Sequence, residues 1–72
     1  MKLRYIRFAN ERTMINRKAQ PFVQVGTEGV TEIDMSNGIV RVVCKDGPEP
    51  ITLLPWAQCA HAHVMPEELA KK

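Results

Sequence analysis

The sequence lacks a long apolar run, a glycine-rich motif and more than two cysteines. Its apolar stretches are far shorter than the roughly 20 residues that a membrane-spanning helix needs, and its charged N-terminus has no apolar core of the kind found in secretion signals. We therefore expect a soluble protein of the cytoplasm. The four glycines lie in separate turns, so a phosphate-binding glycine loop is excluded.

The two cysteines, Cys44 and Cys59, exclude a disulfide framework. In a cytosol both thiols would stay reduced, and Cys44, placed in the middle of a predicted strand, is expected to be a small buried side chain. A chain of 72 residues forms one small domain over residues 1–72. Such a domain rarely has room for a buried pocket, so we expect no cofactor and no enzymatic activity.

Residues 30–54 contain three β-prone runs, which are separated by Asn37-Gly38 and by Asp46-Gly47. Asparagine or aspartate followed by glycine accepts positive φ angles at little cost, and tight hairpin turns require such angles. The pattern therefore predicts a three-stranded antiparallel meander.

Alternation within these runs predicts which side chains face inward. Val40, Val42 and Cys44 form an apolar stripe, which indicates a central strand covered on that face. In the preceding run, strict alternation places Ile33 on one face and Val30 on the other.

Residues 2–8 alternate only in part, with Leu3 and Tyr5 on one side and Ile6 and Phe8 on the other. Their aromatic and β-branched side chains favour a strand. A three-residue spacing of apolar side chains also fits a helix. We predict a strand.

The remaining segments are short. Residues 9–20 are polar and basic, and we expect a mobile segment there or a frayed second strand. A short strand is predicted for residues 22–25, followed by a glycine-bounded turn. Residues 55–59 suit one 3₁₀ or α turn because proline is tolerated at the first helical position, and residues 60–65 can form a closing strand.

Residues 66–72 are expected to be a frayed tail. Glu67 and Glu68 after Pro66 suit a helix N-terminus, but so few residues follow that any helix would be marginal. The predicted fold is mainly β: a small antiparallel sheet, or an SH3-like partly open barrel, with one short helical turn.

Three stretches resemble small phage-encoded β proteins, in which a Lys-Asp-Gly hairpin leads to a Pro-Trp turn and a last strand. They are residues 40–47 (VRVVCKDG), 51–56 (ITLLPW) and 60–64 (AHAHV). The resemblance covers residues 39–64, and it assigns a functional role to no individual residue of this chain. It implies a non-enzymatic accessory or host-takeover protein, for example one that binds the host transcription machinery.

Charge is distributed unevenly along the chain. Residues 1–18 carry six cations and one acid, a net +5, whereas the remainder carries four cations and seven acids, a net −3. A basic arm on a mildly acidic body indicates contact with an anionic partner, although it could also be a solvated terminus. The candidate partner-binding residues are Arg4, Arg7, Arg12, Arg17, Lys18 and Trp56.

One cluster could bind a metal ion. On a strand, Cys59, His61 and His63 would project to one face, and Cys44 could supply a fourth ligand for zinc. The spacing is not that of a zinc finger. The alternative places both histidines on the surface with no metal, and this is the interpretation that we adopt.

Two functions remain open. The first is a small protein that binds and regulates a protein partner, with RNA polymerase as the partner that the phage-like resemblance implies. Trp56 would either cap the core or anchor that interface. The second is a nucleic-acid-binding small barrel, in which Arg4 and Arg7 supply charge while Tyr5 and Phe8 supply stacking surfaces. The alternative for these residues places Tyr5, Ile6 and Phe8 in the core, with the arginines solvating an edge strand. The chain would act as a monomer or as an edge-paired homodimer.

Overall fold

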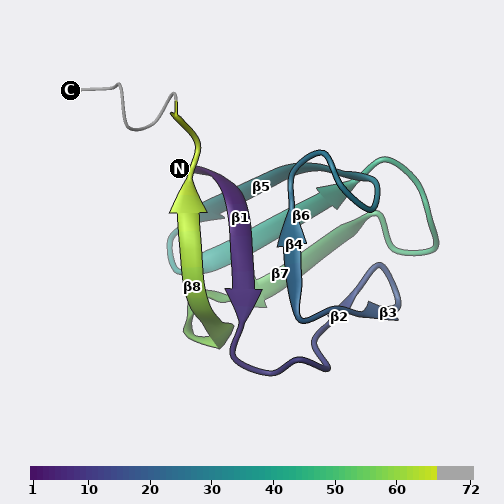
Figure 1. Ribbon diagram of the computed structural model, residues 1–72, viewed down its shortest axis with the longest axis horizontal. Helices are drawn as coiled ribbons and strands as arrows, with labels where there is room; N and C mark the ends of the chain where they lie inside the picture. Colours follow the sequence, from purple (N-terminus) through teal and green to yellow (C-terminus); the bar gives the residue numbers. More distant parts are fainter. Residues whose placement is uncertain (67–72) are drawn as a thin grey trace.

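The computed structural model describes residues 1–66 and shows a mainly β, antiparallel fold with a single 3₁₀ turn (Figure 1). In chain order the elements are β1 (Lys2–Phe8), β2 (Met14–Ile15), β3 (Lys18–Ala19), β4 (Phe22–Gln24), β5 (Val30–Ser36), β6 (Ile39–Cys44), β7 (Ile51–Pro55), η1 (Trp56–Gln58) and β8 (Cys59–Val64).

The main sheet has the order β4-β1-β5-β6-β7, and β8 pairs with β1. In Figure 1, β1 and β8 lie side by side and cross steeply over β5, β6 and β7. Among the described strands, β7 pairs with β6 alone, so the sheet is open rather than a closed barrel. The predicted fold class is confirmed.

The predicted meander is present as β5, β6 and β7. Asn37 and Gly38 both have positive φ angles, 53° and 77°, as expected for a two-residue hairpin turn. The stripe of Val40, Val42 and Cys44 is buried. The predicted one-turn helix and closing strand are η1 and β8.

The predicted faces of two strands were wrong. Leu3 and Ile6 are both buried, because the β1–β8 ladder shifts its register and leaves Arg4 as an extra residue between them. Val30 and Ile33 are also both buried, because the β5–β6 ladder shifts after Val30. Each irregularity reverses the inward and outward alternation of the strand.

The core is small and entirely apolar. Within residues 1–66 no polar or charged residue is buried. The buried residues are Leu3, Ile6, Phe8, Ile15, Val23, Val30, Ile33, Val40, Val42 and Cys44.

The basic segment of residues 9–20 contains the β2–β3 hairpin. Its two-residue turn is formed by Asn16 and Arg17, both with positive φ, and Ile15 just before the turn is fully buried. The Asn16 side chain donates to the Asp46 carbonyl and accepts from the Glu49 N–H, both at 2.8 Å. The hairpin is thereby tied to the loop between β6 and β7. The mobility expected for this segment stays a prediction.

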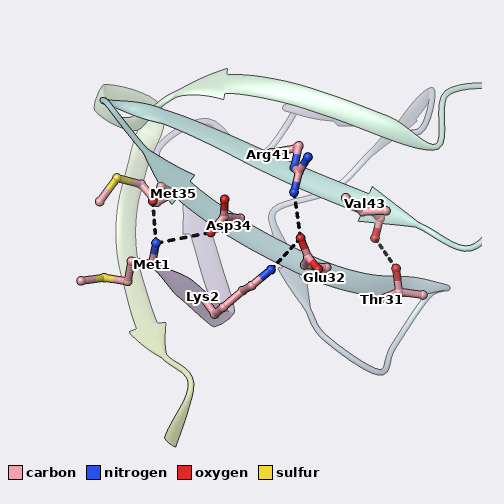
Figure 2. Close-up of polar contacts among 8 residues, drawn as sticks. All are labelled: Met1, Lys2, Thr31, Glu32, Asp34, Met35, Arg41 and Val43. Carbon is pink, nitrogen blue, oxygen red and sulfur yellow. Dashed lines mark hydrogen bonds and ion pairs between the residues drawn. The ribbon is translucent and has the colours of Figure 1, made fainter. Parts of the chain in front are cut away.

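Polar contacts join β1, β5 and β6 on the outer face of the sheet (Figure 2). Glu32 Oε2 lies 2.9 Å from Lys2 Nζ and 2.9 Å from Arg41 Nη2. The hydrogen bond to Lys2, more than any other contact, lowers the pKa of Glu32. The N-terminal ammonium group bonds to the Asp34 carboxylate at 3.3 Å, which holds the start of β1 against β5.

The frayed tail predicted for residues 66–72, including the helix start at Glu67 and Glu68, lies beyond the described residues except for Pro66. Within residues 1–66 no helix has the length and apolar character to span a bilayer.

Candidate functional site

Aromatic and basic side chains from three strands share the outer face of β4, β1 and β8. The ladder register sets them in two rows. One row contains Phe22, Arg7 and His61, and the next contains Gln24, Tyr5 and His63. Because Ile6 between Arg7 and Tyr5 is buried, both of these side chains point outward.

Four of these side chains form what we call the aromatic platform: Tyr5, Phe22, His61 and His63. The Tyr5 ring centroid lies 5.7 Å from that of Phe22 and 5.4 Å from that of His63. The two histidine rings lie 4.6 Å apart. Phe22 is 41% exposed, both histidines are exposed, and Tyr5 is half-buried among them. The rings are tilted or edge-on to one another, so the platform is a cluster of separate ring surfaces open to solvent.

Two arginines of β1 accompany the platform. Arg7 stands between Phe22 and His61 in the cross-strand row. Arg4, at the irregularity of β1, lines a small surface groove together with His63. Both arginines are exposed, and within residues 1–66 neither forms an ion pair. Their charges are available to an anionic ligand.

The other predicted basic residues lie elsewhere. Arg17 pairs with Glu49 at 3.0 Å, and Lys18 pairs with Glu28 at 3.3 Å, both on the β2–β3 hairpin side. Arg12 is exposed in the loop that precedes β2. The structure therefore does not gather the six predicted site residues into one patch.

The stacking pair predicted from the sequence was half wrong. Phe8 is only 4% exposed and belongs to the core, so it cannot stack on a ligand. Its place beside Tyr5 is taken by Phe22 from β4, with His61 and His63 from β8. Only the strand pairing reveals these partners.

The predicted metal-ligand cluster is divided between two faces. The Nε2 atoms of His61 and His63 lie 2.9 Å apart on the surface. Cys59 packs against the core, because the β1–β8 ladder shifts again between Arg7 and Phe8. Among residues 1–66, no three histidine, cysteine or carboxylate side chains come together as metal ligands.

Neither thiol is in an environment that would make it reactive. Burial raises the pKa of Cys59, and burial together with the nearby Asp46 raises the pKa of Cys44. Both groups therefore carry little thiolate at neutral pH, and thiolate is the nucleophilic form.

Trp56 lies in η1, directly before β8, and 40% of its surface is exposed. Together with Met1, Met35, Cys59 and further side chains of β8 it lines a surface groove of about 540 Å³. Trp56 thus presents an apolar face to solvent beside this groove.

A scan of family models and searches of curated proteins and of solved structures each found no match to this chain.

Proposed function

We propose that this protein is a non-enzymatic binding protein for single-stranded nucleic acid. Bases stack on the aromatic platform, and Arg4 and Arg7 contact the phosphates. The observation that carries the proposal is the position of Arg7 between Phe22 and His61, in the row next to Tyr5. Stacking surfaces with interleaved cations are how proteins bind single strands without reading their sequence.

A single strand fits this face better than a duplex does. A duplex buries its base faces in the stack and leaves only base edges and phosphates accessible. Among the elements that lie wholly within residues 1–66, the only helical one is η1, whose three residues are too few to fill a major groove. Side-chain rings that lie open on a sheet can stack only on unpaired bases.

Fluorescence anisotropy with a labelled oligo(dT) strand at low salt tests the proposal. Tyr5→Ala and Phe22→Ala each remove one stacking ring, and each should weaken binding by about 1–3 kcal/mol, roughly 5- to 150-fold. Met14→Ala is the matched control, because Met14 is 54% exposed and lies on β2. Absence of binding at low salt, or equal affinity of all variants, would contradict the proposal.

The salt dependence tests the role of the arginines separately. The slope of log K against log salt is about −0.7 per neutralised phosphate for single strands. Arg7→Ala should make this slope shallower by about 0.7. Arg17→Ala, which removes a cation already paired with Glu49, should leave it nearly unchanged. If Arg7→Ala and Arg17→Ala have equal salt slopes, Arg7 does not contact the phosphates.

Regulation of a protein partner is the second candidate function. It is favoured by the Trp56 groove, which is lined mainly by apolar side chains. An apolar side chain of a partner could insert into this groove. The phage-like resemblance of residues 39–64 makes RNA polymerase the concrete candidate, and binding of purified bacterial RNA polymerase to the wild type and to Trp56→Ala tests it. Absence of binding by the wild type would exclude RNA polymerase.

A further inference from the structure

A second exposed surface, distant in strand order from the platform, covers the outside of the β6–β7 hairpin. Ile39 is 45% exposed, Ile51 55% and Leu53 64%. The register places Ile51 beside Val43 and Pro55 beside Ile39. We define the β7 face as the surface formed by Ile39, Val43, Ile51, Leu53 and Pro55.

The backbone of β7 is also free on one side. Hydrogen bonds from Cys44 N to the Pro50 carbonyl and from Trp56 N to the Gly38 carbonyl define the two ends of the β6–β7 ladder. Antiparallel bonding alternates, so Ile51 and Leu53 direct their N–H and C=O groups away from β6. No strand among the described residues pairs with that edge.

The other edges of the main sheet carry features that discourage pairing. The strand β4 has only three residues, and β8 contains an irregularity where Ala60 is the extra residue. Short strands, bulges, prolines and charged side chains are the usual means of protecting an edge. The strand β7 has five residues, no charge and a regular ladder, and its prolines, Pro50 and Pro55, flank the pairing residues rather than interrupt them.

We propose that β7 pairs antiparallel with β7 of a second copy of this chain, about a two-fold axis. In the register centred on Thr52, Ile51 lies opposite Leu53 of the second copy. Every outward N–H of Ile51 and Leu53 then meets an outward carbonyl. A contact of this kind uses the same surface on both copies and closes as a dimer.

The charges near β7 allow a second copy as the partner. The net charge of +2 opposes self-association only weakly, and β7 itself carries no charged side chain. Arg41, which the register places beside Leu53, has its guanidinium paired with Glu32 at 2.9 Å. Two β7 strands can therefore pair without setting unpaired like charges opposite each other.

The area of the contact sets the expected strength. Edge-to-edge pairing covers the backbone and side chains of β7, and leaves Ile39 and Val43 of β6 one strand away from the contact. The contact is therefore smaller than the ~1,200–2,000 Å² of a standard stable interface. We therefore expect a dimer that dissociates on dilution, with Kd on the order of micromolar or weaker.

Sedimentation velocity over a range of protein concentrations tests the proposal without nucleic acid, so its outcome is separate from that of the proposed function. The wild type should change from monomer to dimer as concentration rises. Leu53→Lys should remain a monomer, and its high exposure means that the fold should tolerate the change. Met14→Lys, a matched control at another exposed site, should dimerise as the wild type does.

Amide hydrogen exchange locates the contact. The N–H groups of Ile51 and Leu53 should exchange more slowly at high concentration than at low concentration, whereas other exposed amides should not change. A monomer at every concentration would overturn the proposal. So would a dimer that Leu53→Lys preserves, or one in which these two amides stay unprotected.

Discussion

Replacing Ile15 with alanine tests whether the β2–β3 hairpin belongs to the folded core. Ile15 is fully buried, although it lies in a segment that is otherwise polar and basic. Deleting most of a buried isoleucine side chain removes its transfer free energy and leaves a cavity, which together cost about 2–5 kcal/mol. A chain of this length has a total unfolding free energy of about 4–11 kcal/mol. The substitution should therefore remove a large part of it.

The effect is large enough for ordinary equilibrium methods. A loss of 2–5 kcal/mol should lower Tm by about 8–40 °C for a domain of this size. Urea denaturation followed by far-UV circular dichroism and by the fluorescence of Trp56 should show a matching drop in midpoint. Met14→Ala is the control, because the neighbouring side chain is 54% exposed and its loss should change stability by less than about 0.5 kcal/mol.

Complete unfolding of Ile15→Ala would leave its cost unmeasured, so Ile15→Val serves as the second variant. It should cost about 0.5–1.5 kcal/mol. The reasoning is refuted if Ile15→Ala is as stable as Met14→Ala. In that case the hairpin would contribute nothing to the core, and residues 9–20 would be the mobile segment that their composition predicts.

Two further substitutions test local features. The folded-state pKa of Glu32 is lowered, so its ion pairs stabilise the fold above the unfolded-state pKa and lose this effect as pH falls through the folded-state pKa. Glu32→Gln should therefore cost up to about 1 kcal/mol at pH 7 by urea titration, and this cost should shrink as the pH is lowered; a cost that does not change with pH would contradict this. Gly47 has φ of 111°, and a Cβ there would overlap the Asn16 side chain. Gly47→Ala should therefore lower Tm more than Gly38→Ala, which has positive φ but open space, and equal shifts would rule out the overlap as a cause.

The strands and turns of the meander could be predicted because their signals are local. Asn37-Gly38 specifies a two-residue turn, and the apolar stripe of β6 specifies its buried face. Asn16 before Arg17 is a much weaker turn signal, because arginine, unlike glycine, adopts positive φ only at a steric cost, and the pair stands among basic residues that favour a loop. Its role depends on the β6–β7 loop, whose backbone its side chain bridges.

The inward and outward faces of β1 and β5 could not be predicted from alternation. One extra residue in each ladder reverses the alternation, and nothing in the local sequence marks the position. This is why Leu3 and Ile6 both reach the core. The extra residue in β1 is Arg4, which is thereby left exposed beside His63.

The platform depends on strand pairing rather than on any motif. Tyr5 and Phe22 become neighbours because β1 pairs with β4, and His61 and His63 join them because β1 also pairs with β8. These contacts span most of the chain, and their register is decided by the core beneath them. Sequence proximity suggested Phe8 instead, since it lies close to Tyr5 in the chain.

Within residues 1–66, the large apolar side chains left outside the core are not scattered. Three lie on the β7 face, one lies on the platform, and two border the groove, so that in this part of the chain only Met14 lies outside these surfaces. They are Ile39, Ile51, Leu53, Phe22, Trp56 and Met1. Strand order places β8 next to β1 and leaves β7 at the far end of β5-β6-β7. A dimer formed through β7 would therefore leave both platforms uncovered. A nucleic-acid strand that is bound to one platform and long enough to reach the other would make the second contact within the same complex. The effective concentration for that second contact is about millimolar when the connecting nucleotides form a short flexible linker.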